Sequence, residues 1–439
     1  MSKLVITPAK KLQGAIEVPG DKSISHRAVM FGSIAEGSTK ISNFLMGEDC
    51  VSTINAFRAM GVEIQLPVPS SQFPVVVKGK GLRGLKEPKK ELYLGNSGTT
   101  IRLLMGILAG QDFESTLTGD ASLSKRPMKR VAESLRLMGA QIGSQFPVPS
   151  SQSKEIYPPL KIKGKYPLKA IDYTLPMPSA QVKSAILLAG LYADGTTTIS
   201  EPLKSRDHTE RMLKEFGANI KVDGLKVSVK RSVLRSKGRI YVPGDISSAA
   251  FFMVAALILG SSRLTIKNMG VNPTRTGIID ILKAMGGDIK ISPIGLNLPE
   301  PMADVTISAS ALKGIVIEGD LIPRAIDELP IVMVAAAFAQ GTTVIKGAGE
   351  LRVKETDRIE SMSGNLKKMG ADITIEQDNI IIRGRETLNG ADVDSFGDHR
   401  TAMSMAIAGL RAQGRTSVLN TDCINTSFPE FEGLLHKLV

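Results

Sequence analysis

The chain has 439 residues, of which 42% are hydrophobic and 22% charged, so it can bury a large core and is not a disordered chain. The net charge is +12, with +16 in residues 1–241 and −4 in residues 242–439. Two cysteines and four scattered histidines exclude a disulfide framework and a zinc site of either residue type. Because the N-terminal stretch lacks the apolar run of a signal peptide and no apolar stretch is long enough to span a bilayer, we expect a cytoplasmic protein.

One short signature recurs along the chain. It reads MGVEI at 60–64, MGAQI at 138–142, FGANI at 216–220, MGGDI at 285–289 and MGADI at 369–373. Each copy follows an amphipathic stretch with apolar residues at helical spacing, and it precedes a short stretch in which apolar and polar residues alternate. Glycine is favoured just past a helix, where the backbone turns left-handed. The signature therefore predicts a helix that ends at each glycine and a strand that begins after it.

A second element lies upstream of these signatures. It is an apolar helix, a turn with Gly and Ser or Thr, and a β-branched strand, as in residues 28–44, 184–200, 253–268 and 333–347, and it returns at 403–420. Together the two elements predict six units of about 70–80 residues, each reading helix–strand–helix–strand.

A longer-range sequence repeat groups these six units into two sets of three. VPGD occurs at 18–21 and again at 242–245, each time before an apolar helix. We therefore predict a mixed α/β fold of two similar domains, one formed by 21–241 and the other by 1–20 with 242–439. A continuous solenoid is the alternative, which irregular unit spacing and the unequal charge of the halves disfavour. A minor repeat, PVPSSQ at 67–72 and 147–152, predicts exposed turns.

Cationic motifs in the first half begin with GDKSISHRA at 20–28. Lys22, Ser23 and Arg27 stand at or near a predicted helix N-terminus, where exposed amides and the helix dipole favour phosphate or carboxylate. In LGNSGTTIRLLMG at 94–106, Gly98 allows a ligand to approach the backbone closely. Ordinary capped helix starts are the alternative for both motifs.

Three further helix starts follow in the first half. In LSKRPMKRV, Pro127 at a first helical position would place Arg126 just before a helix, with Lys129 and Arg130 solvated. PMPSAQVKSA offers Ser179 as an N-cap and Gln181 in the first turn. Arg206 in LKSRDHTE precedes another helix. Structural capping is the alternative for the last two.

The second half contributes carboxylates as well as cations. Asp327 and Glu328 precede a wholly apolar helix, and desolvation raises a carboxyl pKa toward the range of a general acid or base. In LRVKETDRIE, Lys354 and Arg358 bracket Glu355, although a solvated helix face is the alternative. Arg400 lies in FGDHR before another apolar helix. Since helix N-termini carry all these motifs, we expect the cations of both domains to meet in one interdomain cleft.

The motifs GDKSISHRA, GNSGTTIR, LSKRPM, PSAQVKSA, RVKETDR and DHR, in this order over the full chain, resemble the 5-enolpyruvylshikimate-3-phosphate (EPSP) synthase family, or 3-phosphoshikimate 1-carboxyvinyltransferases. The resemblance implies two domains of three βαβαββ units each, with inward-facing helix N-termini at the cleft. It implies enolpyruvyl transfer from phosphoenolpyruvate to the 5-hydroxyl of shikimate 3-phosphate, with release of phosphate, on the shikimate pathway to chorismate and aromatic amino acids. No metal or organic cofactor is implied, and we expect a monomer that binds neither nucleic acid nor membrane.

The family's functional residues carry over onto matching positions of this chain. The resemblance implies that Asp327, Glu355 and Lys22 are catalytic. It implies shikimate 3-phosphate binding by Lys22, Ser23, Arg27, Ser179, Ala180, Gln181, Arg206, Asp327 and Lys354. It implies phosphoenolpyruvate binding by Lys22, Gly98, Arg126, Gln181, Arg358 and Arg400.

The chain departs from the family pattern at three positions. Thr426 stands where some members have a lysine, Glu350 where some have an asparagine, and Ala180 where others have a second serine. The motif around Ala180 resembles members with reduced sensitivity to glyphosate, whereas the small residue Gly98 is typical of sensitive ones. Glyphosate sensitivity therefore stays open.

Two other functions compete with this interpretation. A sister family of the same fold transfers enolpyruvyl to UDP-N-acetylglucosamine and usually carries a reactive cysteine in the loop that corresponds to LSKRPMKR, where this chain has none. A basic nucleic-acid-binding module is the non-enzyme alternative. The absence of Trp and the aromatic content of only 4% disfavour it, because few side chains could stack on bases.

Overall fold

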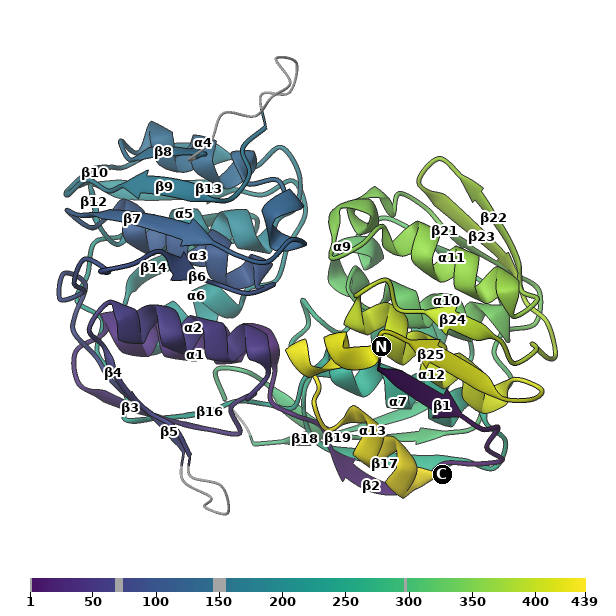
Figure 1. Ribbon diagram of the computed structural model, residues 1–439. Coiled ribbons are helices and arrows are strands. Elements are labelled where there is room, and N and C mark those ends of the chain that lie inside the picture. The colour runs from purple at the N-terminus through teal and green to yellow at the C-terminus, as the bar shows by residue number, and fades with distance from the viewer. Residues whose placement is uncertain (1, 68–73, 145–154, 296–297) are drawn as a thin grey trace. The chain divides into compact units, whose positions relative to one another are not determined.

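The computed structural model describes residues 2–67, 74–144, 155–295 and 298–439. The two PVPSSQ repeats lie outside the described residues, apart from Pro67. The chain forms two compact units (Figure 1). Unit 1 comprises Met1–Asp21 and Pro243–Val439, and unit 2 comprises Lys22–Val242, so each boundary lies one residue beyond the predicted one.

Unit 2 repeats one arrangement of helices and strands three times. The first copy contains α1 (Lys22–Ile34), β3 (Ser38–Ser42), α2 (Glu48–Ala59), β4 (Glu63–Gln65) and β5 (Val75–Lys78). The second contains β6 (Leu92–Tyr93), α3 (Gly98–Ala109), β7 (Glu114–Thr118), the 3-10 helix η1 (Leu123–Lys125), α4 (Lys129–Leu137), β8 (Gln141–Ser144) and β9 (Leu160–Lys163). The third contains β10 (Leu168–Lys169), β11 (Asp172–Thr174), α5 (Ala180–Gly190), β12 (Ala193–Asp194), β13 (Thr196–Ser200), α6 (His208–Glu215), β14 (Asn219–Asp223) and β15 (Lys226–Lys230).

The main sheets of unit 2 share one strand order. Sheets β6–β7–β9–β8 and β11–β13–β15–β14 each begin with a parallel pair and continue with antiparallel pairs. The first copy begins directly with α1. Its leading strand is β16 (Arg239–Tyr241), which pairs parallel with β3. The first and last segments of unit 2 therefore close the same sheet.

Unit 1 follows the same plan. Its first copy contains β2 (Gln13–Glu17), α7 (Ile246–Ile258), β17 (Arg263–Gly270), α8 (Gly277–Ala284), β18 (Asp288–Ile294) and β19 (Met302–Ser308). The second contains β20 (Val316–Ile317), α9 (Leu321–Ala325), α10 (Leu329–Ala337), β21 (Thr342–Ile345), η2 (Gly349–Val353), α11 (Arg358–Lys368), β22 (Asp372–Glu376) and β23 (Asn379–Arg383). The third contains β24 (Asp392–Asp394), α12 (His399–Arg411), β25 (Thr416–Leu419), η3 (Thr421–Thr426) and α13 (Phe431–Leu438), with β1 (Lys3–Ile6) antiparallel to β25. Strand β2 pairs parallel with β17, so both N-terminal strands belong to unit 1.

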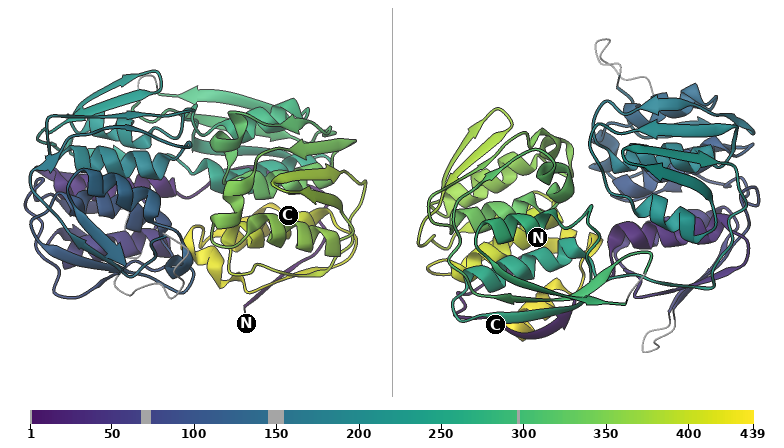
Figure 2. Two further views of the ribbon diagram at one scale, coloured as in Figure 1. Left: turned by 90° about the horizontal axis from the view of Figure 1, so that it is seen from above. Right: turned by 180° about the vertical axis from the view of Figure 1, so that it is seen from behind.

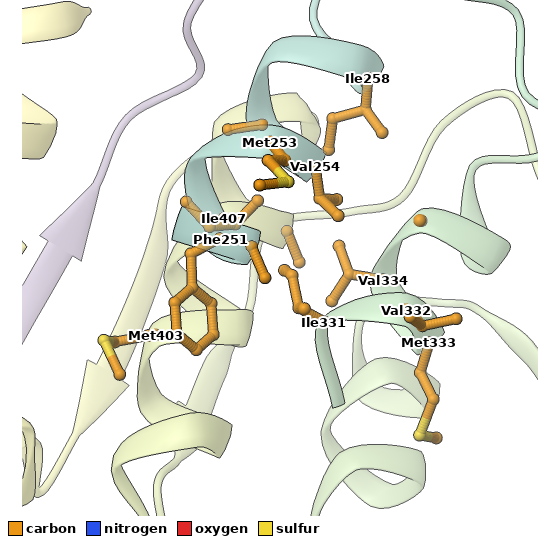
Figure 3. Close-up of a cluster of buried hydrophobic side chains, with 14 of the residues drawn as sticks. Phe251, Met253, Val254, Ile258, Ile331, Val332, Met333, Val334, Met403 and Ile407 are labelled. Atoms are coloured by element: carbon orange, nitrogen blue, oxygen red, sulfur yellow. The ribbon is translucent and has the colours of Figure 1, made fainter. Parts of the chain in front are cut away.

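Three apolar helices form the centre of each unit. In unit 1 these are α7, α10 and α12, which pack against one another, and Val254, Val334 and Ile407 lie among their clustered side chains (Figure 3). Every residue of α10 is buried, as expected of a helix that is hydrophobic all round. The corresponding helices of unit 2 are α1, α3 and α5, and the sheets cover the outside of each unit (Figure 2). Among the described residues, no helix is long and apolar enough to cross a membrane.

The recurring glycine signature marks the same turn at each of its five occurrences. Gly61, Gly139, Gly217, Gly286 and Gly370 all have positive φ, between 79° and 105°. Each follows a helix, and a strand begins two residues later. This conformation is strained for residues with a side chain, so the prediction of a left-handed turn after each amphipathic helix is confirmed.

Candidate active site

Arg27 joins three helix N-terminal regions of unit 2. Its Nε donates to Thr209 Oγ1 in α6 at 2.8 Å, and its Nη2 donates to Ser184 Oγ in α5 at 3.0 Å. Its Nη1 donates to the carbonyl of Ser23 in α1 at 2.9 Å. Only 3% of Arg27 is exposed. The guanidinium therefore holds the N-terminal parts of α1, α5 and α6 together.

A second group of side chains surrounds the start of α3. Arg102 Nη1 donates to Gln181 Oε1 at 2.7 Å, and Gln181 Nε2 donates to Thr99 Oγ1 at 3.1 Å. A Cβ added to Gly98 would lie 3.0 Å from Nη1 of both Arg102 and Arg126. Two guanidinium groups thus converge on a helix N-terminus where a side chain at position 98 would be in tight contact with both, an arrangement that suits an anion.

Arg126 lies just before α4, as predicted, but Pro127 is not the first helical residue. The helix begins at Lys129, and Met128 is the N-cap residue. Met128 donates its backbone N–H to the carbonyl of Ile156 at 2.9 Å, which ties it to a neighbouring segment ahead of the helix. Arg126 is buried and donates to the side chains of Asn96 and Ser122.

Lys22 is the first residue of α1 and forms an ion pair with Asp49 in the first turn of α2. The Nζ–Oδ2 distance is 2.9 Å, and both side chains are largely buried. The carboxylate holds the lysine ammonium at the place where the helices α1 and α2 begin. Ser23, the next residue of α1, is half-buried.

The remaining predicted residues of unit 2 also stand at helix starts. Ser179 caps α5 by accepting the backbone N–H of Val182 at 3.4 Å, so the predicted N-cap is confirmed. Ala180 and Gln181 are the first two residues of this helix. Arg206 is half-buried two residues before α6.

In unit 1 the structure brings together all five predicted residues of the second half. Asp327 Oδ1 lies 3.4 Å from Arg358 Nη1 and 3.5 Å from Lys354 Nζ. Arg400 Nη1 donates to the backbone carbonyl of Asp327 at 2.9 Å. Arg358 Nη2 donates to Glu355 Oε2 at 2.5 Å. One cluster therefore contains two carboxylates and three cations, supplied by residues before α10 and at the starts of α11 and α12.

Arg358 is the centre of this cluster, and only 1% of it is exposed. Its Nε donates at 2.8 Å to Asp398 Oδ2, and Asp398 also caps α12. Burial by itself lowers the pKa of a guanidinium, but the carboxylates of Asp398, Glu355 and Asp327 raise the pKa of Arg358 above its ordinary value. Arg358 therefore stays a cation inside the protein. The alternative of a solvated helix face for KETDR is wrong at this residue.

The sequence motifs do not by themselves identify the acidic partners of these cations. Asp49 and Asp398 each begin or cap a helix, a position where acidic residues are favoured, and this signal could have identified them. Glu328 was noted only as a neighbour of Asp327, yet it is 1% exposed. Arg275, which contacts Glu328, was not singled out at all. No local pattern marks it.

The departures from the family pattern also have a place in the fold. Thr426 Oγ1 donates to the carbonyl of Cys423 at 2.7 Å within η3, so a neutral hydroxyl stands at this position. Glu350 lies in η2, which leads to Lys354. Among the described residues there is no group of three or more His, Cys, Asp or Glu side chains that could hold a metal ion.

Comparison with known proteins identifies the family of the chain. The model of the EPSP synthase (3-phosphoshikimate 1-carboxyvinyltransferase) family matches residues 6–435. The chain belongs to this family. It is 53% identical over 438 residues to 3-phosphoshikimate 1-carboxyvinyltransferase of Geobacter sulfurreducens, with 100% of this chain and 99% of the relative covered. It is 54% identical over 439 residues to the enzyme of the same name from Geotalea uraniireducens, with both chains fully covered.

Solved structures of EPSP synthase share the fold. One from Acinetobacter baumannii is 48% identical in sequence and superimposes with a TM-score of 0.85, covering 99% of this chain and 98% of that one. The predicted mixed α/β fold and the resemblance to EPSP synthase are therefore confirmed.

Proposed function

We propose that the protein transfers the enolpyruvyl group of phosphoenolpyruvate to the 5-hydroxyl of shikimate 3-phosphate and releases phosphate. The observation that carries the proposal is the charged cluster of unit 1, where the half-buried Asp327 and Glu355 lie against the buried Arg358 in a chain of the EPSP synthase family. Such a cluster supplies acid/base groups beside cations that bind anionic reactants, and both are needed for this reaction.

The chemistry has two steps with complementary proton movements. Addition of the hydroxyl oxygen to C2 of phosphoenolpyruvate, with protonation of C3, forms a tetrahedral intermediate. Loss of phosphate and of a proton from C3 then restores the double bond. We assign acceptance of the 5-hydroxyl proton to Asp327 and proton transfer at C3 to Glu355. We assign to Lys22 the role of a point charge or proton carrier.

The two substrates are bound through their charged groups. We assign the phosphoenolpyruvate carboxylate and phosphate to Lys22, Gly98, Arg126, Gln181, Arg358 and Arg400, because guanidinium groups bind both anions bidentately. We assign shikimate 3-phosphate to Lys22, Ser23, Arg27, Ser179, Ala180, Gln181, Arg206, Asp327 and Lys354. Since Arg27 already bonds three protein groups, its contribution is to hold α1, α5 and α6 in place as well as to contact substrate.

A phosphate-release assay with two alternative acceptors tests the function. We expect purified protein to release phosphate from phosphoenolpyruvate when shikimate 3-phosphate is present, and not when it is absent. Release with UDP-N-acetylglucosamine in its place would overturn the proposal in favour of the sister activity. Salt-sensitive retention of DNA without either activity would favour the nucleic-acid-binding alternative. The cytoplasmic location and the monomeric state stay predictions.

A further inference from the structure

Arg275 lies at the centre of a buried charged cluster that the assigned roles do not use. Its Nη1 is 3.6 Å from Asp21 Oδ2, and its Nη2 is 3.5 Å from Asp245 Oδ1 and 3.4 Å from Glu328 Oε1. Nη2 also donates to Ser247 Oγ at 2.6 Å. The Ser247 hydroxyl in turn donates to Glu328 Oε1. All five side chains are at most 10% exposed.

This cluster is poorly suited to stabilising the fold. Three carboxylates face one guanidinium, and Glu328 Oε2 has no hydrogen-bond partner among the described residues. Burial, together with the neighbouring carboxylate of Asp21, raises the pKa of Asp245. Buried ion clusters commonly contribute little net stability, because desolvation of each charge offsets the attraction between them. The cluster is therefore better explained by the segment of backbone that it holds in position.

The segment that carries Arg275 is itself held firmly. Asn272 Oδ1 accepts hydrogen bonds from the backbone N–H and the hydroxyl of Thr274, each at 2.9 Å. The amide of Asn272 donates to Glu300 Oε2, also at 2.9 Å. The backbone N–H of Arg275 donates to the carbonyl of Asn272 at 2.7 Å. These bonds form a compact turn before α8, from which the guanidinium extends as a fixed group.

The Arg275 guanidinium contacts Glu328, the residue next to the proposed base Asp327. Glu328 follows Asp327 and is the N-cap residue of α10. The Arg275–Ser247–Glu328 contacts hold one side of the Asp327–Glu328 peptide, while Arg400 donates to the Asp327 carbonyl. Asp327 is also among the carboxylates that raise the pKa of Arg275 above its ordinary value, against the lowering effect of burial. The turn before α10 is therefore bound from two directions.

We propose that Arg275 and Glu328 are positioning residues for enolpyruvyl transfer, which fix the turn that presents the Asp327 carboxylate to the substrate hydroxyl. The proposal rests on the role assigned to Asp327. Neither residue contacts the substrates; their effect reaches the reaction through the backbone at Asp327. A misplacement of about 1 Å in a reacting group costs on the order of 100-fold in rate, so a modest shift of this turn is enough to matter.

Glu328→Gln is the sharpest test, because it keeps the size of the side chain and removes its charge. We expect kcat to fall by about tenfold or more, with KM for both substrates changed by less than about twofold, since the cations that bind them are untouched. Ser247→Ala, which removes the linking hydroxyl and leaves Arg275 and Glu328 each with one hydrogen bond fewer, should lower kcat in the same way by about three- to tenfold, with some loss of stability. The matched control is Asp320→Asn, a carboxylate-to-amide change at an exposed residue that pairs with the partly buried Arg324, which should leave kcat and KM unchanged.

A fall in kcat at unchanged KM distinguishes a positioning role from a purely structural one. Thermal midpoints measured on the same samples show whether each variant is folded. A Glu328→Gln protein that is folded and keeps kcat within twofold would overturn the proposal, as would a rise in KM at unchanged kcat. If Glu328→Gln does not fold, Ser247→Ala decides by the same criteria. Asp327→Ala in parallel separates the two claims. Retained turnover there removes the role of Asp327 itself, whereas lost turnover there with an unaffected Glu328→Gln removes only the positioning role.

Discussion

At the scale of single residues, the site depends on cations buried against carboxylates. Arg358 and Arg400 are both at most 8% exposed, and each bonds the segment that carries Asp327. Removing one member of such a cluster leaves its partners uncompensated, so charge-removing variants of Arg358 are expected to lose folding as well as binding. The half-buried carboxylates Asp327 and Glu355 are the better positions for testing chemistry alone.

Asp327→Ala and Glu355→Ala test the acid/base assignment. Each variant should still bind both substrates, because the cations remain and Asp327 is only one of the residues assigned to shikimate 3-phosphate. Each should lose about 10²- to 10⁴-fold in turnover, the range that a general acid or base contributes. Equilibrium titration of each substrate and the phosphate-release assay measure the two quantities separately. Turnover near that of the unmodified protein in both variants would remove the assigned roles.

The reaction rates of the two cysteine thiols test whether the native protein has a reactive thiol. Cys50 is fully buried, and burial raises the pKa of Cys423 to about 11. At pH 8 only about one thiol in a thousand is ionised at such a pKa, against about one in four at the ordinary value near 8.5. We therefore expect native protein to react slowly with a disulfide reagent at pH 8, faster as the pH rises, and completely once denatured. Rapid labelling of native protein at pH 8 would contradict this expectation.

At the scale of elements, glycines decide how closely strands and helix ends approach. Gly384 follows β23, and a Cβ there would lie 1.7 Å from the carbonyl oxygen of Ala339 at the end of the α10 segment. Gly79 and Gly164 follow β5 and β9 with the same kind of contact, at 2.0 Å and 2.1 Å from a backbone carbonyl. A glycine directly after a strand therefore marks, in three repeat copies, a place where the backbone lies very close to a carbonyl near a helix end.

Gly384→Ala should consequently destabilise unit 1. The backbone carbonyl at 1.7 Å has to move, and overpacking of this kind costs about 1–3 kcal/mol. The matched control is Gly433→Ala in α13, where no atom lies within 4 Å, and where alanine should stabilise the helix by about 0.5–1 kcal/mol. Denaturant titration of the two variants measures both changes, and equal midpoints would refute the packing explanation.

At the scale of the whole molecule, charge is unequally divided. With the boundaries that the structure shows, unit 2 carries a net formal charge of +15 and unit 1 of −3. The proposed substrates are both small anions, and a cationic surface raises their local concentration and their rate of association. A polyanionic partner is thus not needed to explain the basic composition.

This interpretation predicts a marked dependence on ionic strength. Raising the salt concentration from 0.01 to 0.1 M shortens the Debye length from about 30 Å to about 10 Å and screens the long-range attraction. We expect KM for both substrates to rise by about two- to tenfold over this range while kcat changes little. Steady-state kinetics at several salt concentrations measures this. Constant KM values would show that the excess charge of unit 2 is unrelated to substrate capture.

The sequence by itself was sufficient for the local elements and for the family. Gly217, for example, lies in a signature whose meaning is local, because the left-handed turn after a helix depends only on neighbouring backbone atoms. Ser179 was identified as an N-cap for the same reason. Motifs in a fixed order, such as those around Lys22 and Arg358, were specific enough to indicate EPSP synthase.

Only the tertiary structure decided which charged groups meet. Arg275 lies 30 residues from Asp245 and 53 from Glu328, and no periodicity relates such positions. Their contact arises because α7, α8 and α10 begin close together, and that arrangement depends on how the apolar faces of the helices pack. Hydrophobic patterning and turn chemistry are local and can be deduced from sequence, whereas the pairing of buried charges depends on distances set by the complete core.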